Sequence, residues 1–362
     1  MHARSRRILL AAVLILSWAL AVPASAAPPP ATLKVMSRNL YLGADLAPIL
    51  AAGTQQELVA AATQVYAQVQ ATNFPERAQA LAQEIAQSDP HVVGLQEVTL
   101  WRSQTPADFN PTPNATHVEY DFLQLLLDAL AARGKHYAPR AQVTLTDGEL
   151  PRLTATGLQD IRYTDRDVII ARTDLPASTF SVTGGASAVF QTVLTVPNPV
   201  APVTLLRGWT SVETTLRGHS TRVVNTHLER FVGAIQEAQG AELLAGPLNT
   251  PGDVALVGDL NSAAGGVGAV PGESDTATHA NMLAAGFRDA WTGMRGPGFT
   301  CCHAADLRNP APTLTERIDY VLFRGTLSSS VAELVGEEPA DRTPSGLWPS
   351  DHAGLWAVLQ QR

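Results

Sequence analysis

The chain has 362 residues, of which 45% are hydrophobic and 16% are charged. This composition is typical of a globular protein and excludes a mainly disordered chain. The formal net charge of -8 argues against nucleic-acid binding driven by overall charge, but it leaves room for a locally basic groove.

The first 26 residues have the features of an export signal. Three arginines within the first seven residues precede an apolar stretch, Ile8–Val22, and small residues follow at 24–26. The stretch is short and Pro23 follows it at once, which disfavours a membrane span. We therefore expect a signal peptide over 1–26 and a secreted or periplasmic protein. The alternative is an uncleaved anchor helix.

The remaining chain predicts a single domain. Residues 27–33 begin with an alanine and three prolines, which indicates a short extended leader. Residues 34–362 contain no long linker, repeat or low-complexity tract. We expect one domain over 34–362, a monomer without a stable protein partner, and no transmembrane segment after removal of the signal.

Apolar runs with strand and helix spacing alternate along this domain. In chain order, we predict a strand at 34–39, helices at 55–70 and 76–87, a strand at 92–95, a helix at 119–133 that Gly134 ends, strands at 167–172, 203–216 and 221–227, a helix at 229–244, a strand at 254–258, a helix at 279–285, and strands at 318–323 and 353–359. At least eight strands with intervening helices predict one α/β domain of two stacked sheets.

The only two cysteines, Cys301 and Cys302, are adjacent and cannot join distant segments. Export makes a disulfide chemically possible, so a bridge that locks a loop is one hypothesis and two unpaired thiols are the other. A zinc site on this pair alone is disfavoured, because a structural zinc site normally has four ligands.

Polar residues with catalytic or ligand chemistry stand at the ends of the predicted strands. They are Asn39, Glu97, His227, Asp259, Asn261, Asp319, Asp351 and His352. One acidic residue at a strand end is usually a turn residue. A set of such positions that could converge on one sheet edge predicts a functional site.

The chemistry of these residue types indicates hydrolysis. Asp259 and Asn261 are two residues apart, which in an extended chain places both side chains on one face. A carboxylate can accept a proton from water or bind a metal, and an amide can hold the water or a phosphate oxygen. Glu97 is the strongest metal candidate because hard divalent cations prefer carboxylate oxygens, and Asn39 and Asp351 are further oxygen ligands.

His227 and His352 are the candidates for charge stabilisation or proton donation, because each stands beside other candidate residues. The other histidines of the domain lack such neighbours and are interpreted as structural: His91, His117, His136, His219, His279 and His303.

Six short segments together resemble the endonuclease/exonuclease/phosphatase superfamily of deoxyribonucleases, abasic-site endonucleases, neutral sphingomyelinases and inositol polyphosphate phosphatases. They are Met36-Ser37-Arg38-Asn39, Gly94-Leu95-Gln96-Glu97-Val98, Asn225-Thr226-His227-Leu228, Gly258-Asp259-Leu260-Asn261-Ser262, Arg317-Ile318-Asp319-Tyr320 and Ser350-Asp351-His352. The segments occur in the order of that family.

This resemblance implies a four-layer sandwich of two packed mixed β-sheets flanked by helices, with the site at one edge of the sheets. It also implies that Glu97 binds Mg²⁺ near Asn39, with Asp351 as a second acidic ligand. Mn²⁺ or Ca²⁺ are alternative ions.

The resemblance implies catalytic roles as well. Asp259 would activate or orient the attacking water, and Asn261 would hold a phosphate oxygen. His352, oriented by Asp319, would stabilise the phosphate. His227 would act as a general acid, with Asp165 as its partner.

The predicted function is that of a secreted, metal-dependent phosphodiesterase acting on nucleic acid or on a phospholipid or sphingomyelin-type head group. A phosphomonoesterase for sugar or inositol phosphates is the alternative, since it would use the same residues. A non-catalytic binding module is disfavoured because no candidate position is lost. Thr99 stands where the deoxyribonucleases carry arginine, and the cysteines of the pancreatic enzyme's two disulfides are absent, which weakens a deoxyribonuclease assignment.

Overall fold

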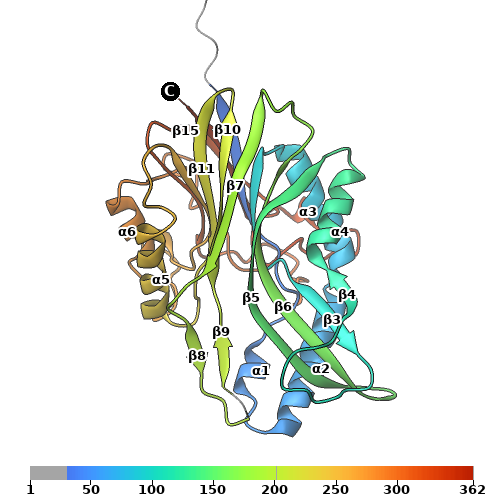
Figure 1. Ribbon diagram of the computed structural model, residues 1–362. Helices are drawn as coiled ribbons and strands as arrows, with labels where there is room; N and C mark the ends of the chain where they lie inside the picture. Colours follow the sequence, from blue (N-terminus) through green and yellow to red (C-terminus); the bar gives the residue numbers. More distant parts are fainter. Residues whose placement is uncertain (1–30, 201, 362) are drawn as a thin grey trace, which may run out of the picture. The chain divides into compact units, whose positions relative to one another are not determined.

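Two mixed β-sheets stack face to face with helices on their outer faces in the computed structural model of the chain (Figure 1). The structure describes residues 31–200 and 202–361, and residues 31–362 form one unit. The predicted signal peptide, residues 1–26, lies outside the described residues. The predicted four-layer α/β sandwich is confirmed.

The first sheet has eight strands. They are β1 (Thr32–Asn39), β2 (Val92–Gln96), β3 (Leu100–Gln104), β4 (His117–Asp121), β5 (Tyr137–Thr154), β6 (Gly157–Arg172), β15 (Ser328–Val335) and β16 (Gly354–Gln360). Their order across the sheet is β15-β16-β1-β2-β6-β3-β4, and β5 pairs with β6. β1 and β2 are parallel, and the other neighbours are antiparallel.

The second sheet has six strands. They are β7 (Phe180–Val189), β10 (Gly208–Leu216), β11 (His219–His227), β12 (Val254–Asp259), β13 (Arg288–Asp289) and β14 (Asp319–Arg324), in the order β13-β14-β12-β11-β10-β7. Two short strands, β8 (Leu194–Val196) and β9 (Val203–Leu205), form a separate hairpin.

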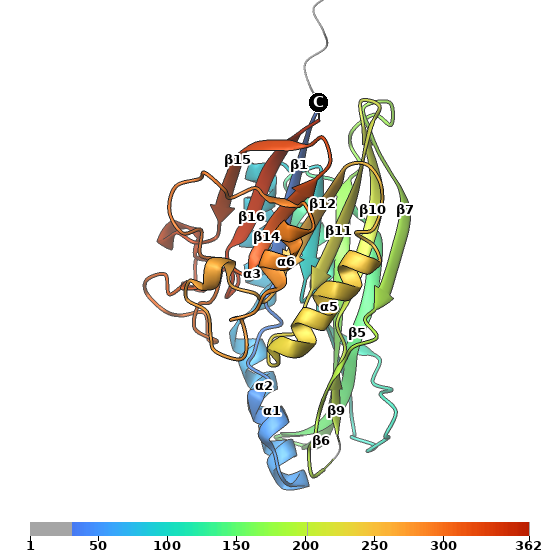
Figure 2. The ribbon, with the colours of Figure 1, turned by 90° about the vertical axis from the view of Figure 1, so that its left-hand side faces the viewer.

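Helices cover the outer face of each sheet and lie on opposite sides of Figure 1, and Figure 2 looks onto the helices of the second sheet. On the first sheet lie α2 (Gln55–Ala71), α3 (Phe74–Ser88) and α4 (Phe122–Ala131), with the short α1 (Ala47–Ala51) before them; on the second lie α5 (Gly233–Ala245) and α6 (Thr278–Ala284). Thr54 caps α2 by a reciprocal pair of hydrogen bonds with Glu57. Within the described ranges, no helix combines the length and the apolar character needed to cross a bilayer.

Apolar side chains fill the space between the two sheets. The buried residues of this layer include Leu33, Val35, Val92 and Ile169 from the first sheet and Val223, Ala255, Val257 and Val321 from the second. Alternate residues of the central strands β1, β2, β11 and β12 point to this layer, and the others point to the helices, as the two-residue period of a strand requires. The strands are therefore covered on both faces where they approach the site.

One polar bridge crosses this apolar layer. Gln96 Nε2 donates to Asn225 Oδ1 at 2.6 Å, and Asn225 Nδ2 donates to the Leu95 carbonyl at 3.1 Å. Gly94 makes the approach possible, because a Cβ there would lie 2.6 Å from Asn225 Oδ1 and 2.4 Å from Val257 Cγ2. A side chain at position 94 would therefore displace the Asn225 and Val257 side chains.

Several element bounds differ from those predicted. β1 begins at Thr32, so the last two residues of the expected 27–33 leader belong to a strand. The predicted strand at 203–216 is two strands, β9 and β10, because residues 206–207 interrupt it and β10 joins a different sheet.

Two predicted helices begin later than expected. The helix expected at 119–133 begins at Phe122, because residues 117–121 pair with β3. The helix expected at 229–244 begins at Gly233. There the Glu229 carboxylate accepts hydrogen bonds from the backbone of Arg230 and Phe231 and holds the chain in a loop.

A buried ion pair joins β1 to α3. Arg38 Nε lies 2.9 Å from Glu84 Oε2, and Arg38 Nη2 lies 3.1 Å from Glu84 Oε1. The third nitrogen of Arg38 donates to the carbonyl of His352. Burial raises the pKa of Glu84 to about 6 although Arg38 opposes the shift. The pair thus fixes the backbone beside His352 to the outer helices.

We expect Arg38→Met to lower the free energy of unfolding by about 3–5 kcal/mol, because Glu84 is then buried without its partner. Urea denaturation followed by circular dichroism measures this loss. The double variant Arg38→Met/Glu84→Met removes both charges and is expected to recover part of it. A double variant less stable than the single one would contradict the assignment.

Candidate active site

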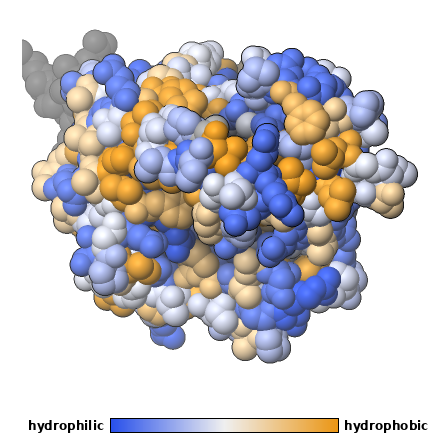
Figure 3. All heavy atoms as spheres, turned by 90° about the horizontal axis from the view of Figure 1, so that it is seen from below, coloured by the Kyte–Doolittle hydropathy of each residue, from blue (hydrophilic) through white to orange (hydrophobic). Residues whose placement is uncertain are grey.

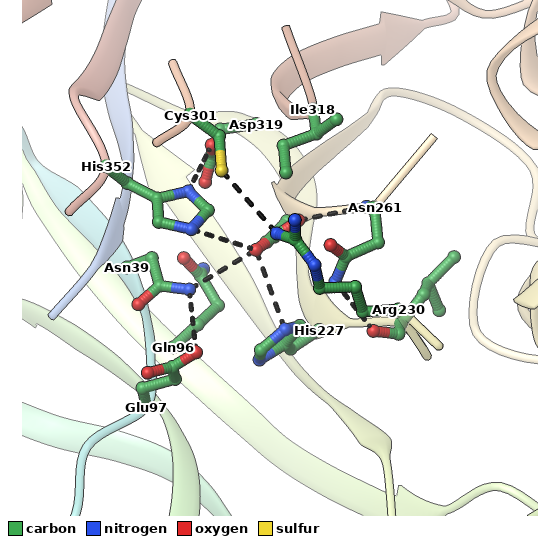
Figure 4. A network of polar contacts seen from close by, with 12 residues as sticks. Asn39, Gln96, Glu97, His227, Arg230, Asn261, Cys301, Ile318, Asp319 and His352 are labelled. Atoms are coloured by element: carbon green, nitrogen blue, oxygen red, sulfur yellow. Dashed lines mark hydrogen bonds and ion pairs between the residues drawn. The ribbon is translucent and has the colours of Figure 1, made fainter. Parts of the chain in front are cut away.

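The predicted polar residues meet at one edge of the two sheets. Parallel pairing of β1 with β2 and of β11 with β12 brings their carboxyl ends together. β14 and β16 run the opposite way and begin at this edge. His227, Asp259 and Asp319 are direct register partners across three neighbouring strands. All eight predicted site residues lie at this edge, and Figure 4 shows most of them.

His352 and Asp319 form a buried pair. His352 Nδ1 lies 2.8 Å from Asp319 Oδ2, and His352 Nε2 lies 3.8 Å from Asp259 Oδ2. Burial lowers the pKa of His352, but the charges of Asp319, Asp351 and Asp259 outweigh it and raise the pKa to about 10. The raised pKa favours the imidazolium form of His352 at neutral pH, and the contact with Asp319 holds the ring in its orientation.

Asp259 lies at the centre of the polar cluster. Its Oδ1 accepts from the backbone of Asn261 at 2.9 Å, and its Oδ2 accepts from Asn39 Nδ2 at 3.2 Å. Burial and the charge of Asp319 raise the pKa of Asp259 to about 7, against the opposing charge of His352. A carboxyl group with such a pKa can exchange a proton near neutral pH.

His227 is held between Asp259 and Arg207. Its Nε2 lies 3.5 Å from Asp259 Oδ2, and its Nδ1 lies 3.0 Å from Arg207 Nη1. Burial and the charge of Arg207 hold the pKa of His227 well below its usual range. Because Arg207 can only donate, His227 Nδ1 is assigned as the acceptor and Nε2 as the protonated nitrogen.

The expected pairing of Asp165 with His227 is not found. Arg207 occupies that place, with its Nη1 3.8 Å from Asp165 Oδ2. Asp165 and Asp167 are both buried, and neither Asp167 oxygen has a hydrogen-bond partner among the described residues. Burial and the charge of Asp165 raise the pKa of Asp167 well above its usual range. These two acidic residues therefore form a second layer behind Arg207.

Glu97 and Asn39 form the opposite side of the cluster. Glu97 Oε2 accepts from the backbone of Leu42 at 2.7 Å, and its Oε1 accepts from Asn39 Nδ2 at 3.3 Å. The Asn39 oxygen accepts from the backbone of Tyr41 at 2.9 Å. That backbone donor fixes the amide orientation, so Asn39 presents nitrogen and not oxygen to Glu97 and Asp259. In this arrangement Asn39 holds the carboxylates in place.

Glu97 and Asn261 both adopt left-handed backbone conformations, with φ of 54° and 48°. Such conformations are uncommon outside glycine and cluster at functional sites. Asn261 Nδ2 donates to the Leu228 carbonyl at 3.0 Å, and Gln236 donates to the Asn261 carbonyl. Asn261 is thus held firmly beside Asp259.

Glu97 and Asp351 fit the binding of a hard divalent cation. Both side chains line one cavity together with Asp259. Burial and the charge of Glu97 raise the pKa of Asp351 to about 6, while His352 opposes the shift. Two carboxylates that repel each other in one cavity are a donor set that a cation relieves. Asp259, Asp319 and His352 also lie close together and form a second group that could hold a cation.

Several residues of the site were missed from the sequence. Arg207 follows β9, and Arg230 lies in the loop before α5 with Nη1 3.6 Å from the sulfurs of both Cys301 and Cys302. Cys301 and Cys302 are paired with each other, and Cys302 Sγ lies 4.0 Å from His352 Nε2. The break in the apolar pattern at Arg207 was the available signal for that residue. Nothing in the sequence placed the cysteines beside the site.

The cavity at this edge has a volume of about 500 Å³. Its polar part includes the predicted residues Glu97, His227, Asp259, Asn261, Asp351 and His352. His303, interpreted as structural, also lines it and stacks on Trp348 with ring centroids 4.0 Å apart. Burial lowers the pKa of His303 to about 4. The remaining wall is mostly apolar.

Known proteins share this fold. An endonuclease/exonuclease/phosphatase family protein from Bacteroides thetaiotaomicron superimposes with a TM-score of 0.54 at 15% identity. The match covers 92% of this chain and 100% of that chain. The protein from Beutenbergia cavernae gives 0.52 at 21% identity, covering 91% and 72%, and D. rerio TDP2 in complex with a single-strand DNA product gives 0.52 at 17% identity, covering 91% and 98%. No curated protein matches this chain. The family model for the Endonuclease/Exonuclease/phosphatase family matches residues 64–352, and the chain therefore belongs to that family.

Proposed function

We propose that this chain is a secreted phosphodiesterase that hydrolyses its substrate with the help of a divalent metal ion. The observation that carries the proposal is the position of Asp259, whose raised pKa suits a base, between the two histidines and opposite Glu97 and Asp351. The features of residues 1–26 support export.

Asp259 is the proposed general base. A water oxygen forms a bond to phosphorus, and the proton of that water passes to Asp259 Oδ2. The bond from phosphorus to the leaving oxygen breaks, and this oxygen departs with the bonding electron pair and takes up a proton from solvent water. The pKa of about 7 keeps a large part of this carboxylate deprotonated at neutral pH while preserving its basicity. Asn261, held beside it, orients the water or a phosphate oxygen.

The two histidines have different proposed roles. His352 carries a positive charge toward the phosphate and stabilises the negative charge that develops on its oxygens. His227 is neutral with its proton on Nε2, so it donates a hydrogen bond to an oxygen of the reacting group. The resemblance implied a general acid at this position, but a neutral imidazole is too weak an acid for that step.

Glu97 and Asp351 are the proposed metal ligands, with Mg²⁺ as the first candidate and Mn²⁺ or Ca²⁺ as alternatives. The bound ion would supply neutralisation of the phosphate charge. Asn39 keeps Glu97 and Asp259 in position through its amide nitrogen. The number of carboxylates at the site favours a singly charged phosphodiester over a doubly charged monoester.

A substrate panel with and without chelator tests the proposal. We expect hydrolysis of bis-p-nitrophenyl phosphate, and we expect EDTA to lower its rate by about a hundredfold or more, because a catalytic metal supplies several kcal/mol. Added Mg²⁺ should restore the rate. Full activity in EDTA would contradict the assignment of Glu97 and Asp351 as metal ligands. Phosphate release from p-nitrophenyl phosphate without diester cleavage would select the monoesterase instead, and plasmid DNA and sphingomyelin separate the two diester classes.

A further inference from the structure

The cavity extends from the catalytic residues into an apolar lobe, which we define by Leu46, Ile49, Leu58, Leu150, Ile161 and Leu205. These residues come from α1 and the loop before it, α2, the β5–β6 hairpin and β9. Figure 3 views the end of the domain that carries these elements, and hydrophobic side chains gather at its surface among hydrophilic ones.

The walls of the apolar lobe are fixed by hydrogen bonds between distant segments. Asn198 Nδ2, in the β8–β9 hairpin, donates to the Ala52 carbonyl after α1 at 2.7 Å. The backbone of Leu153 donates to Thr63 Oγ1 of α2 at 2.8 Å, which ties the β5–β6 hairpin to that helix. The lobe is therefore formed in the free protein and is not a chance gap between mobile loops.

Its side chains are only partly buried by the protein itself. Of the six residues that define the apolar lobe, Ile161 alone is buried, and Phe231 beside the catalytic residues is 44% exposed. Leucine and isoleucine side chains gathered around a fixed hollow lower their free energy when an apolar group displaces water from it. The lobe is thus suited to an apolar ligand.

The charges that line the cavity argue against a polyanion as the ligand of the apolar lobe. Among the described residues that line the cavity, the only arginines are Arg207 and Arg230, and the lining contains no lysine. Arg207 is engaged by His227 and the acidic residues behind it, and Arg230 lies against the cysteine sulfurs. Asp45 and Glu149 add negative charge to the rim. A nucleic-acid strand would need cations along this path for its further phosphates.

We propose that the apolar lobe binds an uncharged aliphatic chain that is part of the phosphodiester whose phosphate lies at Asp259 and His352. The substrate class is then an amphiphilic, lipid-like phosphodiester. This inference rests on the proposed function and deepens it, because it assigns the group on one side of the scissile phosphate. The six residues that define the lobe are aliphatic, and the aromatic side chains of Tyr66, Trp101 and Tyr163 line the same cavity, so a phenyl ester is included in the test.

A homologous series of n-alkyl p-nitrophenyl phosphates, from methyl to dodecyl and below their micelle concentrations, tests the inference. We expect kcat/KM to rise about fourfold for each added methylene group, which is the value of one buried CH₂, until the lobe is filled. It should then level off. If the methyl compound is hydrolysed but kcat/KM does not change with chain length, the lobe does not bind an alkyl chain, and the proposed function still stands. A phenyl ester that exceeds every alkyl ester, or plasmid DNA cleaved faster than the octyl compound, would also contradict alkyl-chain binding.

Binding is measured separately from turnover. Titration with n-alkyl phosphonates, followed by tryptophan fluorescence, should show affinity that increases with chain length, since Trp101 lines the cavity. If no diester in the series is hydrolysed, the proposed function fails, but these titrations still show whether the lobe binds an alkyl chain. A phosphonate affinity that does not depend on chain length would contradict alkyl-chain binding.

Matched variants locate the effect. Leu150→Asn in the lobe is expected to lower the ratio of kcat/KM for the octyl over the methyl compound by about tenfold. Leu283→Asn, on α6 and outside the cavity with 40% exposure, is the control and should keep the wild-type ratio. An unchanged ratio in Leu150→Asn, with phosphonate affinity also unchanged, would overturn the assignment of this wall.

Discussion

Replacement of Asp259 by asparagine is expected to lower kcat by about 10²–10⁴-fold, the range that general acid–base catalysis contributes. The amide keeps the size and part of the hydrogen bonding of the carboxylate but cannot take the proton of the attacking water. Steady-state hydrolysis of bis-p-nitrophenyl phosphate measures the loss, with circular dichroism to show that the fold is retained.

The dependence of kcat/KM on pH shows whether Asp259→Asn removes the general base or instead disrupts the structure of the site. In the wild-type protein kcat/KM should rise with pH up to about 7, because Asp259 acts in its deprotonated form and its pKa is raised to about 7. Asp259→Asn should lack this acidic limb. Asp128→Asn, on the exposed face of α4, removes one negative charge elsewhere and should keep both rate and profile. Wild-type turnover in Asp259→Asn would remove Asp259 from the mechanism.

His352→Gln should lower kcat by about 10²–10³-fold, the cost of removing one preorganised group that stabilises transition-state charge. The wild-type rate should fall as pH rises through about 10, because His352 acts in its protonated form and its pKa is raised to about 10. The variant should lose this alkaline limb.

His279→Gln is the matched control for His352→Gln. His279 is also a buried histidine paired with an aspartate, with its Nε2 3.1 Å from Asp289 Oδ2, but it does not line the cavity. A loss of stability without loss of turnover is expected there. If both variants reduced turnover equally, the effect would reflect general packing and His352 would have no special role.

The fold class and the convergence of the site could be predicted because each motif marks the end of a buried strand. Gly258-Asp259 and Thr226-His227 end two neighbouring parallel strands, so their side chains meet wherever those strands pair. A continuous apolar run made these strands visible in the sequence.

Other elements leave a weaker signal in the sequence. β7 is exposed along most of its length, and much of β5 is polar, so neither shows an apolar run. The partner of His227 could not be predicted because Arg207 reaches it from outside any motif. The apolar lobe was also missed, since its residues come from separate segments that only the tertiary fold brings together.

The polar bridge between Gln96 and Asn225 has a consequence for how this fold can diversify. His227 and Asp259 belong to one sheet, and Glu97 and His352 flank strands of the other. The close approach at Gly94 lets the two sheets lie near each other beside these proposed catalytic groups. The lobe is built instead from hairpins and helices outside that contact. If the proposed roles hold, the apolar lobe and the polar cluster belong to separate parts of the chain, and we expect changes in the β8–β9 hairpin to alter binding more than turnover.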